Sequence, residues 1–253
     1  MATIIAIANQ KGGVGKTTTC VNLAYALKKR GRKVLLADCD AQGNATSGMG
    51  VDKAHTPNMY HILSQGVPVQ DCIVHTNYGD VIPTNKDLSG ASVELVDMED
   101  REYILRQALE SVAEQYDYIL IDCPPSLELL TVNALAAADS VLVPVQCEYY
   151  ALEGIADLTT TIKMINSRIN PKLEIQGIVL TMYDSRTNFS EQVAGEIRKY
   201  FGNKVYKTTI PRNVRIAEAP SHGKPVIAYD RISRGSAAYL KLAAEIVKQI
   251  EGK

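Results

Sequence analysis

Residues 9–19, N-Q-K-G-G-V-G-K-T-T-T, constrain the fold more than any other stretch of the chain. They follow residues 3–8, a short apolar run rich in isoleucine that predicts a buried strand, and they precede residues 20–30, where apolar residues recur at helical spacing. A glycine-rich turn from a strand into a helix lets backbone N–H groups surround a phosphate, and the N-terminus of the helix adds unpaired donors and a positive dipole end. The stretch therefore predicts a nucleotide-binding site.

The side chains of this loop suggest separate tasks. Lys16 can reach the β- and γ-phosphates of a nucleotide, and the hydroxyl of Thr17 can bind Mg²⁺. The usual pattern, G-x-x-x-x-G-K-[ST], has a glycine where this chain has Gln10, and here a second lysine, Lys11, stands beside it. The expected nucleotide-binding residues of the loop are Lys11, Gly12, Gly13, Val14, Gly15, Lys16, Thr17 and Thr18.

Acidic residues follow two further predicted strands. Residues 32–38 form an apolar run that ends in D-C-D-A-Q-G-N, and residues 118–122 form another that ends at Asp122. Ligands bind beyond the carboxyl ends of strands in open α/β sheets, so both ends are candidate site segments. A carboxylate at Asp122 can hold Mg²⁺ through its water shell. The alternatives are that Asp40 and Asp122 only cap turns or helices.

The loop K-G-G-V-G-K-T-T resembles the deviant Walker A motif of the ParA/MinD family of ATPases. In that family Lys11 would reach the ATP of the opposite subunit, in a sandwich dimer that forms with ATP. The segment D-C-D-A-Q-G-N resembles the family's switch I, which implies that Asp40 orients or activates the attacking water and that Asp38 has a structural role. The family's usual proline is Ala41 here. D-C-P-P, starting at Asp122, resembles switch II.

Later segments extend the resemblance over the whole chain. Q-C-E-Y-Y-A-L-E-G, residues 146–154, is similar to the chromosomal, Soj-type branch of ParA proteins, in which it lies near the dimer face. The family resemblance also implies that Met182, Pro211 and Asn213 contact the adenine. No N-K-x-D motif, which would read guanine, occurs in the chain, and this favours ATP over GTP. The implied cofactors are ATP and Mg²⁺.

Strand and helix patterns alternate along all 253 residues, with an amphipathic helix expected at 101–115, a last strand at 205–210 and a final helix from Ser233. This alternation predicts an α/β fold, with a mainly parallel, doubly wound P-loop NTPase sheet and helices on both faces. Without an internal repeat or linker, residues 1–253 are expected to form a single domain. The four histidines lack metal-ligand spacing, and the five cysteines include no C-x-x-C pair.

Charge is uneven along the chain. The net charge is −1, yet residues 181–235 hold ten lysines and arginines against five acids, whereas residues 87–100 are acidic. Together with the Soj-type resemblance, this local excess of +5 predicts sequence-independent binding to DNA phosphates, with Arg186 and Arg215 as the main contacts. Further basic residues could extend the surface: Lys199, Lys204, Lys207, Arg231 and Arg234.

The resemblance implies an ATP-hydrolysing partition switch that is cytoplasmic and nucleoid-associated, with a ParB/Spo0J-type centromere-binding partner. The alternative is a MinD-like, membrane-associated positioning ATPase. That alternative is disfavoured because the final helix mixes lysines and glutamates on its polar face and the chain stops three residues after Ile250, where MinD-like chains carry a basic amphipathic tail. No secretory signal and no apolar run of membrane-spanning length are recognisable.

Overall fold

The computed structural model describes residues 1–126, 128–148 and 151–252, and within them the chain forms one twisted sheet in the order β3-β4-β2-β5-β1-β6-β7. The strands are β1 Thr3–Ile7, β2 Val34–Asp38, β3 Val74–Thr76, β4 Gly79–Ile82, β5 Tyr118–Asp122, β6 Ser140–Gln146 and β7 Glu174–Thr181. All pairings are parallel except the short hairpin of β3 with β4. The expected mainly parallel α/β sheet is therefore confirmed.

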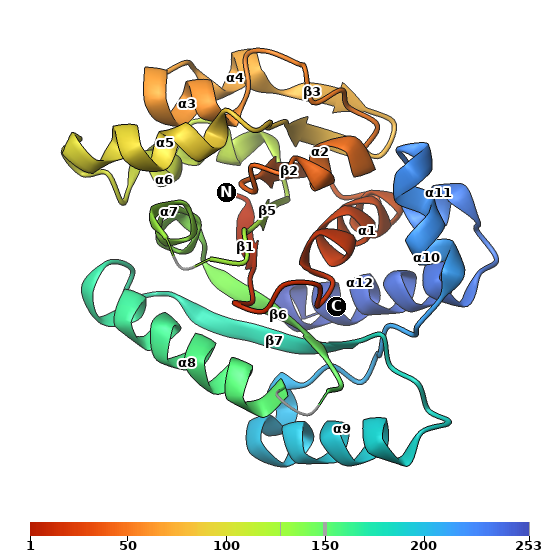
Figure 1. Cartoon of the computed structure of the whole chain (residues 1–253). Helices are drawn as coiled ribbons and strands as arrows, with labels where there is room; N and C mark the ends of the chain where they lie inside the picture. The colour runs from red at the N-terminus through yellow and green to blue at the C-terminus, as the bar shows by residue number, and fades with distance from the viewer. Residues whose placement is uncertain (127, 149–150, 253) are drawn as a thin grey trace.

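Helices cover both faces of the sheet (Figure 1). The α-helices are α1 Lys16–Lys29, α2 Asn44–Gly48, α3 Met59–Gln65, α4 Val69–Cys72, α5 Leu88–Glu94, α6 Ile104–Glu110, α7 Leu129–Ala137, α8 Ala151–Arg168, α9 Asn188–Phe201, α10 Val214–Glu218, α11 Val226–Tyr229 and α12 Arg234–Glu251. Short 3₁₀ turns include η1 Leu95–Asp97, η3 Gly202–Lys204 and η4 Ala219–His222.

The core is split in two by the sheet, because successive strand residues point to opposite faces. Ile5 and Ile7 of β1 pack with the buried residues of α1 and α12, whereas Ile4 and Ala6 pack on the other face with those of α3, α5, α6, α7 and α8. Each face buries an aliphatic layer under amphipathic helices, which is the arrangement of a doubly wound sheet.

The strand expected at 205–210 is absent. This segment touches β7 through a single bridge between Ile178 and Val205 and through separate hydrogen bonds. The N–H groups of Lys207 and Thr208 instead donate to the carboxylate of Glu245 on α12, at 2.8 and 3.1 Å. Since these donors are engaged by a side chain, no strand ladder continues along the segment.

The helix expected over residues 101–115 is shorter than its apolar periodicity suggested. It is reduced to α6, which starts at Ile104 and ends at Glu110. Asn133 of α7 explains the late start, because its amide accepts a hydrogen bond from the N–H of Leu105 and donates one to the carbonyl of Arg101. A side chain from a neighbouring helix therefore occupies groups that would belong to the first helical turn.

Candidate functional site

Three strand ends meet at one edge of the sheet. In the parallel register Asp122 of β5 lies beside Ile7 of β1 on one side and beside Asp38 of β2 on the other. The glycine-rich loop leaves β1 at this edge and leads into α1. The sequence motifs that lie far apart along the chain are thus brought together by the order of three adjacent strands.

The loop has the backbone that its glycines were expected to permit. Gly13 and Gly15 have φ angles of 75° and 92°, a left-handed region that side-chain-bearing residues rarely adopt. Gly15 is also the N-cap residue of α1, so the helix begins at Lys16 with no side chain over its free N–H groups. The loop is anchored by a hydrogen bond from the Thr181 hydroxyl to the carbonyl of Val14, at 2.7 Å.

Lys16 is buried at the centre of this arrangement. Its ammonium donates to the carbonyl of Lys11 at 3.1 Å, and its side chain is 7% exposed. Burial lowers the pKa of Lys16, and the nearby carboxylates of Asp122 and Asp40 oppose that shift. A cation that is held under the loop by the carbonyl of Lys11 and lies near two acids is suited to bind an anion that enters over the N-terminus of α1.

Lys11 points elsewhere. Its ammonium lies 2.5 Å from a carboxylate oxygen of Glu148, and both side chains are about two-fifths exposed, at 39% and 44%. The structure therefore places the second lysine of the loop in an ion pair within its own chain. Glu148 belongs to the segment of residues 146–154 that was expected near a dimer face; Tyr149 and Tyr150 of that segment lie outside the described residues.

Asp38 is fully buried and is held by its own loop. One carboxylate oxygen accepts from the N–H and the hydroxyl of Thr46, both at 2.7 Å, and the other accepts from the N–H of Asp40 at 3.2 Å. Burial raises the pKa of Asp38 to about 6, against the effect of these donors. The expected structural role of Asp38 is consistent with these contacts, which join the end of β2 to α2.

Asp40 stands at the rim of the site. One of its oxygens accepts from the N–H of Gln42 at 3.0 Å, as in an ordinary aspartate turn, while the other has no hydrogen-bond partner among the described residues. The side chain is partly exposed and close enough to Lys16 to influence the pKa of that lysine. The geometry accommodates both the predicted water-positioning role and the alternative role in the turn.

Asp122 is the unusual group of the site. It is fully buried, and neither of its carboxylate oxygens has a hydrogen-bond partner in the part of the chain that the structure describes. Burial and the carboxylate of Asp38 raise the pKa of Asp122, and the nearby Thr17 hydroxyl and Lys16 ammonium offset only part of that rise. An unpaired buried carboxylate is costly, so it calls for a cation.

These residues fit Mg²⁺. The hydroxyl of Thr17 and the carboxylate of Asp122 are oxygen donors, and Mg²⁺ at nucleotide sites takes few protein ligands and completes its shell with phosphate and water. Among the described residues no group of three or more histidine, cysteine, aspartate or glutamate side chains is arranged to hold a metal by itself. The site is therefore suited to a metal that arrives with a nucleotide.

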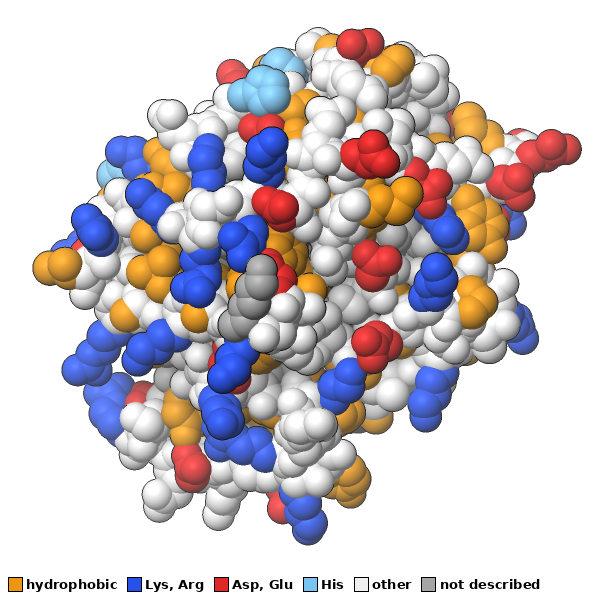
Figure 2. All heavy atoms as spheres, turned by 180° about the vertical axis from the view of Figure 1, so that it is seen from behind, with side chains coloured by type: hydrophobic (Ala, Val, Ile, Leu, Met, Phe, Trp, Pro, Cys, Tyr) orange, Lys and Arg blue, Asp and Glu red, His pale blue; other side chains and the backbone are white. Residues whose placement is uncertain are grey.

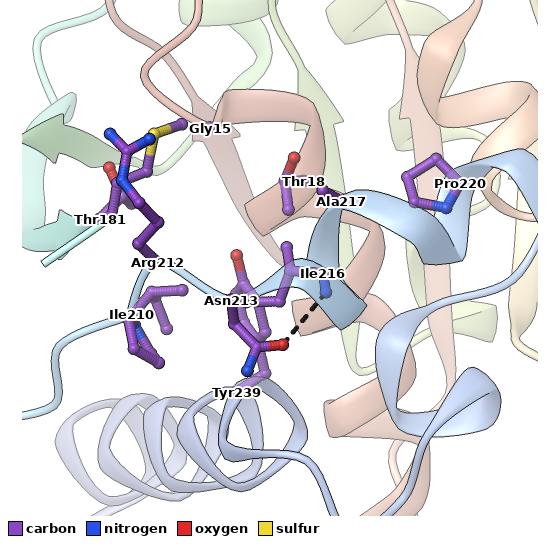
Figure 3. A pocket seen from close by; sticks show the side chains of 12 residues that line it. Gly15, Thr18, Thr181, Ile210, Arg212, Asn213, Ile216, Ala217, Pro220 and Tyr239 are labelled. Carbon is purple, nitrogen blue, oxygen red and sulfur yellow. Dashed lines mark hydrogen bonds between the residues drawn. The ribbon is translucent and has the colours of Figure 1, made fainter.

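A cavity of about 310 Å³ lies beside the loop (Figure 3). It brings together the three predicted adenine contacts, Met182, Pro211 and Asn213, with Gly15 and Thr18 of the loop. The amide oxygen of Asn213 accepts from the N–H of Ile216 at 3.3 Å and so caps α10. Its amide nitrogen is therefore the group that Asn213 can offer to a ligand.

Sequence reasoning missed most of the wall of this cavity. The other lining residues are Thr181, Ile210, Arg212, Ile216, Ala217, Pro220 and Tyr239. Tyr239 comes from the buried face of α12, with its hydroxyl 3.5 Å from that of Thr19. Its only sequence signal is an aromatic residue on the inward face of the final helix, which core packing explains equally well.

Both arginines predicted to bind DNA are paired with acids. Arg186 makes two side-chain hydrogen bonds to Asp184, at 2.8 and 2.7 Å, and Arg215 pairs with Glu218 at 2.8 Å and with Asp230 at 3.3 Å. A bridge between Tyr183 and Pro211 brings the two segments that carry them alongside each other. The structure thus brings together the segments that precede the two arginines and pairs each arginine with an acid of its own chain.

The chain is similar to known proteins over most of its length. A family model described as AAA domain matches residues 2–175. The sporulation initiation inhibitor protein Soj of Bacillus subtilis is 57% identical over 249 residues, covering 97% of this chain and 98% of that protein. The chromosome partitioning protein ParA of Caulobacter vibrioides (strain NA1000) is 53% identical, covering 97% and 94% of the two chains.

Solved structures show the same fold. A cobyrinic acid a,c-diamide synthase from Mycobacterium smegmatis, crystallised with ADP and magnesium, has a TM-score of 0.88 at 36% identity, covering 100% of this chain and 97% of that one. The cell division ATPase MinD of Pyrococcus furiosus has a TM-score of 0.81 at 30% identity, covering 98% and 99%. The likeness spans all strands that form the site.

Proposed function

The chain belongs to the ParA/Soj family of chromosome-partitioning ATPases, and from that premise we propose that it is a nucleotide switch whose ATP-bound dimer binds DNA without sequence preference. A ParB-type centromere-binding partner would stimulate hydrolysis and so release the dimer from DNA. The observation that carries the proposal is the buried carboxylate of Asp122 beside Thr17 and Lys16, which has no hydrogen-bond partner among the described residues. Such a carboxylate becomes satisfied when a metal–nucleotide complex enters.

In this proposal each residue has a defined task. Thr17 and Asp122 would hold Mg²⁺, which would supply positive charge to neutralise the phosphates. Lys16 neutralises the β- and γ-phosphates over the helix N-terminus, and Asp40 orients the attacking water. The base enters the cavity beside Met182, while the backbone of residues 12–18 surrounds the phosphates.

The proposal of a dimer depends on the role of Lys11, the second lysine of the loop. Lys11 and Lys16 on one loop would repel each other at the same phosphate, and Lys11 already points away from the site toward Glu148. In a sandwich of two ATP-bound chains, Lys11 would leave Glu148 and neutralise charge on the partner's nucleotide, as an arginine finger does. ATP then acts as part of the interface.

The proposed DNA surface includes a second hollow, whose wall contains Ser185, the residue before Arg186. Lys207, Arg234 and Lys241 line it together with the hydroxyl-bearing residues Tyr183, Ser185, Thr208 and Thr209. Lysines, arginines and hydroxyls bind phosphate oxygens and carry no sequence information by themselves. Two copies of this surface in one dimer would double the phosphate contacts, which makes DNA binding depend on ATP.

The proposed location is the cytoplasm, on the nucleoid. Among the described residues no helix combines the length and the apolar character needed to cross a bilayer. The MinD-like alternative would need an anionic-lipid-binding surface, and the polar face of α12 offers Lys241 and Lys248 interleaved with Glu245 and Glu251. The mixed charge of this face gives that alternative no support.

Light scattering with ATP, with ADP and without nucleotide, each with and without duplex DNA, tests the proposal. We expect dimers with ATP but not with ADP or without nucleotide. Only the ATP-bound dimer should bind two unrelated duplexes, and its affinity should fall steeply as the salt concentration rises. Arg186→Ala and Arg215→Ala should weaken binding to both duplexes and lower the salt slope while dimers persist. Lys16→Ala should lower nucleotide affinity by roughly 10–100-fold, because a charged hydrogen-bond donor is lost. Equal DNA affinity in ATP and ADP would contradict the switch.

A further inference from the structure

The outer surface of α5 and η1 is both apolar and acidic. Leu88, Ala91 and Leu95 anchor this segment in the core, while Val93 and Val96 are turned outward with 75% and 52% of their surface exposed. Met98 follows at 37% exposure. We call these three exposed residues together with the surrounding acids the α5 surface. Val93 and Val96 are three positions apart and so share one side of the helical segment.

The charge around these apolar residues is strongly negative. Residues 87–102 hold six acids, Asp87, Glu94, Asp97, Glu99, Asp100 and Glu102, against the single basic residue Arg101. Arg101 is already paired with Glu102 at 3.2 Å, and Asp97, Glu99 and Asp100 have no ion-pair partner among the described residues. In Figure 2 red and orange side chains, with some blue ones between them, lie on the right, the side where α5 lies when Figure 1 is turned round.

We propose that the α5 surface docks a basic, amphipathic segment of a protein partner. Large exposed apolar side chains gathered on one patch favour a protein contact, and a surrounding rim of acids, three of them without an ion-pair partner among the described residues, selects a partner of opposite charge. The occupant is a segment with lysines or arginines on one side and apolar side chains on the other. Rim charges of this kind mainly raise the association rate and make it sensitive to salt.

The position of the surface separates it from the proposed DNA contacts. The α5 segment follows β4 near one edge of the sheet, whereas Arg186 follows β7 at the other edge. In Figure 2 blue side chains dominate the left and lower parts of the molecule, away from the acidic side. A chain held on DNA through its basic side would therefore leave the α5 surface open to the partner.

The surface is also connected to the site. Thr84, which lies between β4 and α5, donates its N–H to the hydroxyl of Thr46 at 2.9 Å, and Thr46 donates to Asp38. The carbonyl of Thr84 comes so near to Gly43 that a side-chain carbon there would lie 2.8 Å from it. The segment bearing the α5 surface thus packs against the loop that carries Asp40.

This inference rests on the proposed function for the identity of the partner, a ParB-type protein, and the experiment separates the two. ATP turnover is measured in the full chain with duplex DNA while the cognate ParB-type protein is titrated in. The double variant Val93→Ser/Val96→Ser should raise the half-stimulating partner concentration at least tenfold, with basal turnover and DNA binding unchanged. Asp97→Lys/Glu99→Lys should do the same and reduce the salt dependence of stimulation.

Matched controls are Met164→Ser, an equally exposed apolar residue on α8, and Glu114→Lys, an exposed acid outside the surface; neither should alter stimulation. A second titration uses three synthetic helical peptides. The first has lysines on one face and leucines on the other, the second replaces the leucines by serines, and the third replaces the lysines by glutamates. We expect only the lysine–leucine peptide to bind tightly, and to lose at least tenfold in the Val93→Ser/Val96→Ser chain.

If the wild-type chain is not stimulated by the ParB-type protein, the partner assigned in the proposed function is wrong, and the peptide titration still decides the docking proposal. If stimulation and peptide binding are the same in wild type and in both α5 variants, the α5 surface is not a docking site.

Discussion

The ammonium of Lys11 lies 2.5 Å from the carboxylate of Glu148 in the same chain, so the lysine proposed to act on a partner's nucleotide is held by its own subunit. The two residues are 137 positions apart, and β1 and β6, the strands that precede them, are neighbours in the sheet. Dimerisation in the proposed form must exchange this ion pair for a contact between Lys11 and phosphate. The exchange can be tested from either side.

Lys11→Ala removes the proposed contact to the partner's nucleotide. Hydrolysis should fall by roughly 10³-fold, in the range known for the loss of an arginine finger, because developing charge on the phosphates is no longer neutralised in trans. ATP-dependent dimers should disappear, whereas nucleotide binding by the single chain persists through Lys16. Turnover assays, light scattering and nucleotide titration measure the three effects. A monomeric variant with wild-type turnover would rule out the role in trans.

Glu148→Gln should act in the opposite direction. The amide cannot hold Lys11 as an ion pair, so less free energy is lost when the lysine moves to the partner. Both side chains are substantially exposed, and each such pair is worth at most about 1 kcal/mol. Because a dimer of two chains exchanges two of these pairs, ATP-dependent dimers should form at up to roughly 30-fold lower protein concentration. Glu174→Gln breaks a comparable exposed pair with Lys204 and should leave dimerisation unchanged. Weaker dimerisation of Glu148→Gln would show that Glu148 supports the dimer.

Asp40→Ala separates the timing of hydrolysis from assembly. If Asp40 orients the attacking water, the variant should bind ATP and form dimers while hydrolysis falls by about 10²–10⁴-fold. Asp52→Ala is the matched control, because Asp52 accepts a hydrogen bond from the N–H two residues on, at 2.9 Å, as Asp40 does. Rapid turnover by Asp40→Ala would show that Asp40 only stabilises the turn and has no role in hydrolysis.

The sequence predicted those features that depend on local pattern and on strand order. Asp38 and Asp122 were recognised because each ends an apolar run, and the parallel sheet then had to bring both to one edge. The positive φ angles of Gly13 and Gly15 follow from the same turn that the motif describes. Local chemistry and topology agree here, so little tertiary information was needed.

What the sequence could not predict depends on side chains that meet across the fold. The segment expected as a strand at 205–210 has β-forming residues, yet Glu245 of α12 takes two of its N–H groups. The pairing of Lys11 with Glu148 and the place of Tyr239 in the cavity wall likewise depend on contacts between distant segments. Local propensity gives way to such contacts.

Asp184→Asn tests the ion pair at the proposed DNA surface. Asp184 accepts two side-chain hydrogen bonds from Arg186, whose guanidinium holds the pKa of that carboxyl at about 2. Removing the negative charge should tighten DNA binding in ATP and steepen its salt dependence, because Arg186 no longer shares its charge. Glu110→Gln, which breaks a helical pair with Arg106, should leave DNA binding unchanged. Weaker binding by Asp184→Asn would instead mean that Asp184 orients Arg186 toward the phosphate.

Asp122→Asn tests the unpartnered carboxylate through pH. Burial raises the pKa of Asp122, so between the pKa of an unfolded aspartate, about 4, and the raised folded value the native chain binds more protons than the unfolded chain. The contribution of Asp122 to stability is therefore fully present below about pH 4 and is lost as pH rises through the folded pKa. Asparagine stays neutral and avoids that loss.

Without nucleotide or Mg²⁺, the melting temperature of Asp122→Asn should consequently gain on that of the wild type as pH rises from 4 to 8, by roughly 2–4 °C for each kcal/mol relieved. With Mg²⁺ and ATP the order should reverse, because only the carboxylate can hold the metal, and the wild type gains stability from the ligand. Asp117→Asn, at the opposite end of the same strand, is the control whose effect should not reverse with the ligand. If the difference in melting temperature between wild type and Asp122→Asn changes neither with pH nor with Mg²⁺ and ATP, Asp122 neither titrates abnormally nor binds the metal.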